Sequence, residues 1–139
     1  MPNPVPPPDE SAPLRILHLE DAPADAALIA WTLRMAGIQC RITRVDTESN
    51  FVDALRLIDI DLILSDSNIR GFSGMAALEM AQAANTAIPF IIVSGSTSRE
   101  MKNEALRLGA ADCLAKDHRI QLVFLVQRIW QNKQDTLEG

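Results

Sequence analysis

The stretch that decides the fold is Asp61-Leu62-Ile63-Leu64-Ser65-Asp66-Ser67-Asn68. An uncharged, mostly apolar run leads up to the Asp66 carboxylate, and polar residues with Gly71 follow it in an expected loop. A run of this length between turn-forming residues is typical of a parallel strand buried on both faces, which ends here at Asp66. Ligands of open α/β sheets bind beyond the carboxyl ends of the strands, so we expect Asp66 at the floor of a binding crevice.

On both sides of this strand, short apolar runs alternate with segments of helical periodicity. Five strands and five helices at a spacing of roughly 22 residues indicate repeated βα units around one parallel sheet. Right-handed crossovers and short loops leave few arrangements of such units. We predict an α/β fold with a flavodoxin-like, doubly wound sheet of strand order 2-1-3-4-5, because this order covers both faces. The expected strands are 14–19, 40–45, 62–66, 90–93 and 111–115.

Several residues mark where the helices begin. Pro23 suits the first turn of the first helix, and Thr47 is a predicted N-cap of the second. Thr97, with Glu100 three residues later, has the spacing of a capping box for the fourth helix. The last helix is predicted over about residues 119–133, with an apolar inner side.

The composition describes one folded domain with short tails. Residues 1–13 hold six of the eight prolines and few apolar side chains, so we expect a flexible proline-rich N-terminal tail. Residues 14–133 are enough for a single well-covered core, and 134–139 are expected to form a C-terminal tail.

Charge and hydropathy exclude some classes of protein. A formal net charge of −5 disfavours direct nucleic-acid binding, because phosphates would not be neutralised. No apolar run approaches the roughly 18 residues of a membrane helix, and the N-terminus lacks the pattern of a signal peptide, so we expect a cytoplasmic chain with no membrane contact. Cys40 and Cys113 lie in expected strands, where buried free thiols are favoured over a disulfide or a metal pair.

Polar residues stand at the carboxyl ends of four expected strands that are neighbours in the predicted order: Glu20 and Asp21, then Asp66, Ser94 and Lys116. The three carboxylates would raise one another's pKa unless a cation lay among them. Mg²⁺ suits this set better than a calcium cage that needs more oxygen ligands, and zinc is disfavoured because no His or Cys stands near.

Such a pocket has the groups needed for phosphoryl transfer. Asp66 would be the carboxylate nucleophile, and Ser94 and Lys116 would hold the phosphoryl oxygens, giving an aspartyl phosphate. Each group also has a simpler role: Asp21 could only cap the helix that begins at Pro23, a serine at a strand end often forms a turn, and a lysine at a helix start is often a solvated surface group. The combination favours the chemical interpretation.

The chain closely resembles the receiver domain of two-component response regulators, of the CheY-like superfamily. The resemblance covers about residues 14–132 and is strongest to receivers attached to, or encoded beside, sensor kinases. The matching segments are Leu17-His18-Leu19-Glu20-Asp21, residues 61–66 with Gly74 eight residues on, Val93-Ser94-Gly95, and Leu108-Gly109-Ala110-Ala111-Asp112-Cys113-Leu114-Ala115-Lys116.

The resemblance implies a signalling phosphoacceptor that assists its own phosphorylation and dephosphorylation, rather than an enzyme. Asp66 would accept a phosphoryl group from a phosphohistidine on a histidine kinase or a histidine phosphotransfer protein. Ser94 would hydrogen-bond that group and Lys116 would pair with it. The implied Mg²⁺ ligands are Asp21, Glu20 through water, Asp66 and the backbone carbonyl of Asn68. A homodimer through the fourth helix, fifth strand and fifth helix would also fit the family.

Two residues depart from the family pattern. Cys113 stands where the family usually has Tyr or Phe, a ring that swings inward when Ser94 moves onto the phosphoryl group. We therefore expect weak coupling between Asp66 phosphorylation and the surface around residues 97–133. Asp117 replaces a common proline after the lysine, and since a cis bond would cost about 3 kcal/mol there, we expect a trans bond and a reshaped loop.

Two other classes of function stay open. A degenerate receiver would act only as a protein-binding scaffold, a reading that Cys113 favours slightly. A small α/β enzyme is the other class. A flavodoxin would need a phosphate-cradling loop where this chain has Glu20-Asp21, which would repel phosphate. A phosphatase with an Asp nucleophile usually has a second Asp two residues later, where this chain has Asn68.

Overall fold

The computed structural model describes residues 12–138. Its central layer is a sheet of five parallel strands in the order β2-β1-β3-β6-β7. Counted along the chain, these are the first to fifth strands of the sheet in the predicted order 2-1-3-4-5, so the flavodoxin-like topology is confirmed. The sheet strands are β1 (Leu14–Leu19), β2 (Cys40–Val45), β3 (Leu62–Ser65), β6 (Phe90–Ser94) and β7 (Asp112–Ala115).

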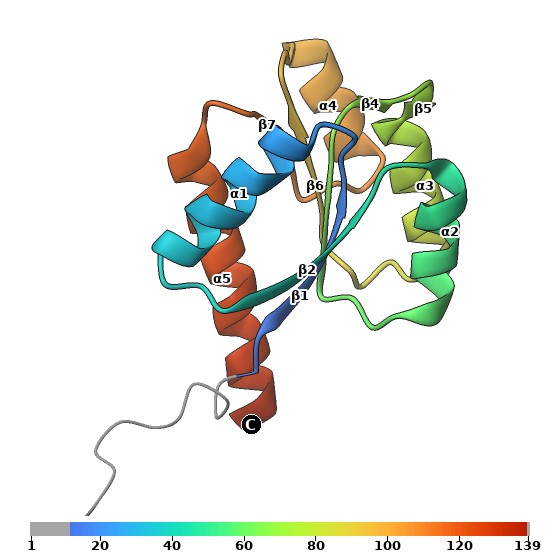
Figure 1. Ribbon diagram of the computed structural model, residues 1–139. Helices are drawn as coiled ribbons and strands as arrows, with labels where there is room; N and C mark the ends of the chain where they lie inside the picture. Colours follow the sequence, from blue (N-terminus) through green and yellow to red (C-terminus); the bar gives the residue numbers. More distant parts are fainter. Residues whose placement is uncertain (1–11, 139) are drawn as a thin grey trace, which may run out of the picture.

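Five helices connect these strands and cover both faces of the sheet (Figure 1). The two faces hold separate apolar clusters. α1 and α5 pack on one face, through Ile29 and Leu33 of α1 and through Leu122 and Val126 of α5. The other three helices supply apolar residues to the cluster on the opposite face. The helices are α1 (Pro23–Met35), α2 (Glu48–Leu57), α3 (Gly74–Ala84), α4 (Arg99–Arg107) and α5 (Arg119–Glu138).

The strand register brings the carboxyl ends of the central strands to one edge. Leu19 of β1 pairs with Ser65 of β3, and Ser94 of β6 pairs with Ala115 of β7. The residues that directly follow these strands therefore lie beside one another. This is the edge at which we predicted the crevice.

The segment after β3 is more ordered than the predicted loop. It forms a small antiparallel hairpin of β4 (Asn68–Ile69) and β5 (Phe72–Ser73), in which Ile69 pairs with Phe72. The two residues between them, Arg70 and Gly71, both have positive φ angles, 52° and 87°. Two positive φ angles in a two-residue loop are the signature of a type I′ turn, which matches the twist of paired strands. An arginine gives little sequence signal for such a turn.

The helix boundaries confirm some predicted caps and correct others. Pro23 begins α1 and the Thr47 hydroxyl caps α2, as predicted. The predicted cap Thr97 is wrong: Ser98 is the N-cap of α4, and its hydroxyl accepts a hydrogen bond from the Met101 backbone N–H. Two adjacent hydroxyl residues offered competing caps, and the later one fits where the helix starts.

The last helix is longer than predicted, because α5 continues from Lys133 to Glu138. Polar contacts hold this additional part against the chain before β1: the side chains of Lys133 and Gln134 donate to the backbone carbonyls of Pro13 and Ala12. Residues 134–138 are thus helical, where we expected a tail. The predicted flexible tail falls on residues 1–11, outside the described residues, and on Ala12 and Pro13, which make these contacts.

Both cysteines are free, as predicted; Cys113 is buried in β7, and Cys40 at the start of β2 is only partly buried. Between residues 12 and 138, no helix combines the length and apolar character needed to span a membrane. The same residues contain no cis peptide bond, so the expected trans bond before Asp117 is present.

Candidate functional site

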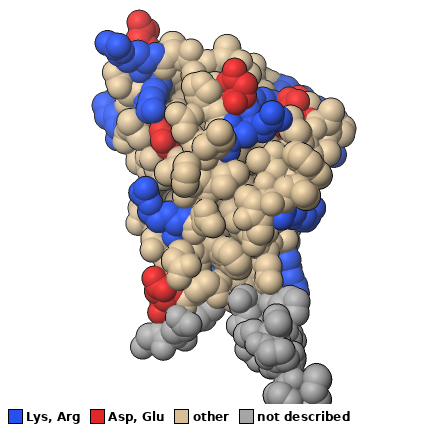
Figure 2. Space-filling view, turned by 90° about the vertical axis from the view of Figure 1, so that its left-hand side faces the viewer, with Lys and Arg blue, Asp and Glu red and all other residues tan. Residues whose placement is uncertain are grey.

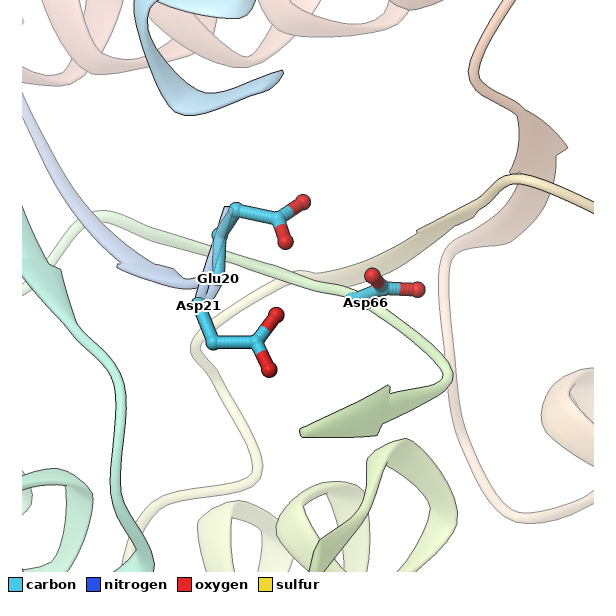
Figure 3. A group of neighbouring side chains, drawn as sticks. All are labelled: Glu20, Asp21 and Asp66. Atoms are coloured by element: carbon cyan, nitrogen blue, oxygen red, sulfur yellow. The ribbon is translucent and has the colours of Figure 1, made fainter. Parts of the chain in front are cut away.

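Three carboxylates converge at the carboxyl edge of the sheet (Figure 3). Glu20 and Asp21 follow β1, and Asp66 follows β3. One oxygen atom from each of the three lies within 4.8 Å of the other two. The structure therefore brings together the acidic residues that the sequence predicted to meet.

The simpler role considered for Asp21, a helix cap, is contradicted. The N-cap of α1 is Ala22, and no side-chain hydrogen bond caps this helix. The Asp21 carboxylate instead points toward Asp66 (Figure 3).

Asp66 is held by contacts to both of its carboxylate oxygens. Its Oδ1 atom accepts a 2.6 Å hydrogen bond from the Ser67 backbone N–H, and its Oδ2 atom lies 3.1 Å from the Lys116 Nζ atom. The backbone N–H of Asp66 donates to the Leu19 carbonyl, which fixes the residue against the end of β1. The side chain is 16% exposed, so it can be reached from solvent, but its contacts keep it from turning freely.

A close backbone approach beneath Asp66 depends on Gly74, the first residue of α3. A Cβ atom on Gly74 would lie 2.5 Å from the Asp66 carbonyl oxygen and 3.2 Å from the Ser67 Cα atom. The Gly74 backbone N–H donates to the Ser67 carbonyl at 2.8 Å. Only a residue without a side chain allows the hairpin to return this close to the acidic residue.

Ser94 is buried at the end of β6 and reaches Asp66 only through another residue. Its hydroxyl donates to the Ser96 carbonyl at 2.8 Å, and its Oγ atom is also 2.8 Å from the Ser67 Oγ atom. Since the Ser94 proton is used on Ser96, Ser67 is the donor between the two hydroxyls. Ser67, which the sequence analysis did not single out, therefore links the predicted serine to the acidic cluster.

Lys116 follows β7, and its side chain extends to the acidic residues that follow β1 and β3. Its Nζ atom lies 2.6 Å from Asp25, 2.8 Å from Glu20 and 3.1 Å from Asp66, so its three protons all face carboxylates. Partial burial works against the charged form, but the hydrogen bonds to Asp25, Glu20 and Asp66 raise the pKa of Lys116 above its ordinary value. The ammonium group is charged at every pH of interest.

Glu20 is almost fully buried, and its neighbours offset only part of the cost of burying its negative charge. Burial raises the pKa of the Glu20 carboxyl, and the hydrogen bonds from Lys116 and from the Ala22 backbone N–H offset this only partly.

His18 of β1, two residues before Glu20, is also buried, and among the described residues its Nδ1 atom has no hydrogen-bond partner. Burial, with the nearby Lys116 charge, lowers the pKa of His18 to about 4, so the ring is neutral at pH 7.

The charges of the cluster fit a hard divalent cation. One ammonium group, that of Lys116, contacts three carboxylates, those of Glu20, Asp25 and Asp66. The Asp21 carboxylate adds a fourth negative charge beside Glu20 and Asp66. Burial disfavours the charged form of a carboxyl group, and further positive charge nearby stabilises that form. Carboxylate oxygens are also ligands that Mg²⁺ prefers. The backbone carbonyl of Asn68 as a further ligand stays a prediction; the Asn68 side chain accepts a hydrogen bond from the Gly71 backbone N–H.

Asp25 is the other residue that the sequence analysis missed. It lies in the first turn of α1, one turn after Asp21, and makes the shortest contact of Lys116. A carboxylate in the first turn of a helix is common, because it complements the helix dipole. Its position one turn after Glu20-Asp21 is a signal that it lies near the acidic residues. Its contact with Lys116 is not encoded locally, because Lys116 is 91 positions away.

Comparisons with known proteins agree with this geometry. The sequence model of the response regulator receiver domain family matches residues 16–127. The cell cycle transcriptional regulator CtrA of Caulobacter vibrioides is 30% identical over 117 residues, which cover 84% of this chain and 50% of CtrA. The sensor histidine kinase RcsC of Escherichia coli K12 is 28% identical over 113 residues, covering 79% of this chain and 11% of RcsC. The chain thus spans half of one relative and about a tenth of the other.

Solved structures share the fold. The receiver domain of a Francisella response regulator, number 1452, superposes with a TM-score of 0.75 at 23% identity, covering 86% of this chain and 98% of that one. The receiver domain of the sensor histidine kinase PA1611 from Pseudomonas aeruginosa has a TM-score of 0.71 at 27% identity, covering 86% and 99%. That structure has a magnesium ion coordinated in its active-site cleft.

Proposed function

The chain belongs to the response regulator receiver domain family, and from this premise we propose that it accepts a phosphoryl group on Asp66 with the help of Mg²⁺. Receiver domains are phosphoacceptors in two-component signalling, and they take the group from histidine kinases or histidine phosphotransfer proteins. The observation that carries the proposal is the convergence of Asp66 with Glu20, Asp21 and Lys116 at one edge of the sheet.

The transfer moves one phosphoryl group between two side chains. An Asp66 carboxylate oxygen attacks the phosphorus atom, the new P–O bond forms, and the P–N bond to the donor histidine breaks, leaving the electron pair on the imidazole. Lys116, already 3.1 Å from the nucleophile, is placed to bind an oxygen of the incoming group. Ser94 would have to turn from the Ser96 carbonyl to do the same.

The metal would be held by Asp21 and Asp66 directly and by Glu20 through water, the three residues whose carboxylate oxygens converge. The carbonyl of Asn68 would be a further ligand. When bound, Mg²⁺ supplies positive charge that neutralises the phosphoryl oxygens as charge develops on them. The same residues would assist hydrolysis of the aspartyl phosphate, because Asp66 is partly exposed and water can reach it.

A surface on α1, the helix that carries Asp25, supports docking of a protein phosphodonor. We call it the α1 face: the exposed apolar residues Leu28, Trp31 and Met35 of α1. Asp25 and Arg34 are the charged residues of α1, and Ile120 and Phe124 of the neighbouring α5 are also exposed. The side of the molecule formed by α1 and α5 accordingly has a broad uncharged area bordered mainly by Lys and Arg (Figure 2). Apolar area that continues from a phosphorylation site favours a protein partner there.

The experiment that tests the proposal is intact mass spectrometry after incubation with acetyl phosphate and Mg²⁺. We expect a gain of one phosphoryl group, about 80 Da, that is labile to hydroxylamine as an acyl phosphate is. The adduct should be absent from Asp66→Asn and present in Asp117→Asn, which removes an exposed carboxylate next to Lys116 in sequence.

Absence of both the adduct and Mg²⁺ binding would overturn the proposal. That result would favour the alternative of a degenerate receiver that binds partners without phosphorylation. The departure at Cys113 is the observation on the side of this alternative.

A further inference from the structure

The contact between Asp25 and Lys116 is not needed to explain phosphoryl transfer. The Lys116 Nζ atom lies closer to Asp25, at 2.6 Å, than to either Glu20 or Asp66. Asp25 belongs to the first turn of α1, whereas Lys116 follows β7. The pair therefore joins the start of α1 to the end of β7 at the carboxyl edge of the sheet.

The three carboxylate partners of Lys116 differ in one respect. Glu20 and Asp66 belong to the group that could hold a metal ion, and Asp25 does not. An ammonium group and a divalent cation that share the same oxygens compete, because each is repelled by the other. Asp25 is thus the one partner of Lys116 among these three that a bound metal leaves untouched.

We propose that Asp25 is a positioning residue that holds Lys116 toward α1, so that Glu20 and Asp66 are available to the divalent cation. The inference rests on the proposed function, since it concerns the same site. In the absence of Asp25, Lys116 would pair with the two metal ligands alone. The cation would then have to displace the ammonium group from both.

The location of Asp25 suits this role. Its side chain is 44% exposed, and it lies in the first turn of α1, where acidic residues are common because they complement the helix dipole. Lys116 is anchored at its other end by its backbone N–H, which donates to the Ser94 carbonyl at 2.8 Å. The side chain consequently has a fixed origin and one partner outside the metal group.

Isothermal titration calorimetry with Mg²⁺ on the full chain tests the inference. In Asp25→Asn we expect the dissociation constant for Mg²⁺ to rise about fivefold, the scale of a well-formed, partly exposed ion pair. Asp25→Glu should remain close to the wild type because it keeps the charge. Asp117→Asn should also leave the constant unchanged, because Asp117 is exposed and contacts His118 rather than Lys116.

A double-mutant cycle shows whether Asp25 acts through Lys116. In a Lys116→Ala background, Asp25→Asn should change the Mg²⁺ dissociation constant by less than about twofold, because no ammonium group remains to compete. An equal rise in both backgrounds would overturn the inference, since Asp25 would then act on the cation directly. No rise in the wild-type background would overturn it as well.

The apparent KM for acetyl phosphate is a second readout, and we do not expect it to rise. At saturating Mg²⁺, Asp25→Asn removes a negative charge beside the incoming anion, so the apparent KM for acetyl phosphate should stay equal or fall, whereas a damaged fold would raise it. Asp25→Ala carries the same expectations and replaces Asp25→Asn if that variant does not fold. If the wild-type chain itself binds no Mg²⁺, the proposed function fails together with this inference; a wild type that binds normally confines any failure to Asp25.

Discussion

Asp61 lies at the edge of the sheet opposite the acidic site, where it joins three segments of the chain. Its Oδ2 atom accepts hydrogen bonds from the Arg15 Nε atom at 3.0 Å and from the Lys133 Nζ atom at 2.6 Å. Burial would raise the pKa of this carboxyl, but the hydrogen bonds from Arg15 and Lys133 outweigh it and lower the pKa from 3.8 to about 2. The charged carboxylate therefore stabilises the fold.

We predict that Asp61→Asn lowers the free energy of unfolding at pH 7 by about 2 kcal/mol, the equivalent of this pKa shift. Because the folded-state pKa lies below the ordinary value, the stabilisation is complete above about pH 4 and is lost as the pH falls toward 2. In urea unfolding, the difference in unfolding free energy between Asp61→Asn and the wild type should be smaller at pH 3 than at pH 7. Asp59→Asn is the control, because Asp59 contacts the same arginine but is 87% exposed; an equal loss there would contradict the prediction.

Gly74 gives a second prediction at this scale. In Gly74→Ala the new methyl group would collide with the Asp66 carbonyl oxygen, and the backbone would have to shift. We expect a loss of about 1–3 kcal/mol in unfolding free energy, as for overpacked sites, together with slower phosphorylation by acetyl phosphate. For stability, Gly95→Ala is the control, since a Cβ atom there meets nothing within 4 Å. Equal stability of the two variants would refute the role given to Gly74.

Residues at strand ends could be predicted from the sequence, whereas residues that act through side-chain contacts could not. Asp66, Ser94 and Lys116 each follow an apolar run, so the topology alone places them together. Asp25 and Ser67 acquire their partners only when helix and hairpin dock. The orientation of Ser94 toward Ser96 also depends on the local turn, which hydrophobic periodicity does not encode.

At the scale of elements, α1 has an unusual surface for a helix that covers a sheet. Its exposed side carries Trp31, 60% exposed, and Met35, 68% exposed. Solvent-facing sides of such helices are normally polar or charged. A partner that covers the α1 face would remove this apolar surface from water.

We predict that Trp31→Glu slows phosphoryl transfer from a histidine phosphotransfer domain that phosphorylates the wild-type chain, by about tenfold, as expected for a central aromatic contact. Phosphorylation by acetyl phosphate should be unchanged, because this small donor needs no docking surface. Leu57→Glu is the matched control, since Leu57 is an apolar residue of α2, across the sheet, and is even more exposed than Trp31, at 74%. Equal slowing in both variants would count against the α1 face.

The sequence predicted the existence of the main elements better than their ends. Apolar runs and helical spacing located all five sheet strands and all five helices of the described residues. The hairpin after β3 escaped because a β-turn with arginine at a positive φ angle lacks the usual Asn-Gly signal. The end of α5 escaped because Lys133 and Gln134 bind backbone carbonyls of the segment before β1, a tertiary contact.

At the scale of the whole molecule, the buried residues of β7 decide how far the proposed phosphorylation of Asp66 would be felt at a distant surface. Cys113 is buried in β7, in the same core cluster as Ala105 of α4. Its thiol is smaller than the aromatic ring usual in the family, so it has little volume to move when Ser94 turns. Pairing of two copies through α4, β7 and α5 stays a prediction that depends on the same surface.

We predict that phosphorylation changes amide hydrogen exchange around Asp66 but only slightly across α4, β7 and α5. The measurement compares peptides from the chain with and without acetyl phosphate and Mg²⁺. Altered protection in residues 62–74 would show that the group is attached. Large changes across α4, β7 and α5 under the same conditions would show that Cys113 does not weaken the coupling.

The contact between Ala12 and the end of α5 also means that the order of the segments along the chain can be changed without moving them in space. The Ala12 carbonyl accepts a hydrogen bond from Gln134, only four residues before Glu138, about 6 Å along a helix. A short glycine linker could join Glu138 to Ala12. New ends could be opened at the exposed turn of residues 85–87, away from the acidic edge. In such a circular permutant the chain would begin with β6 and end with α3, yet the acidic site would be assembled from the same strand ends. The site is thus a property of how the strands lie side by side, not of which is made first.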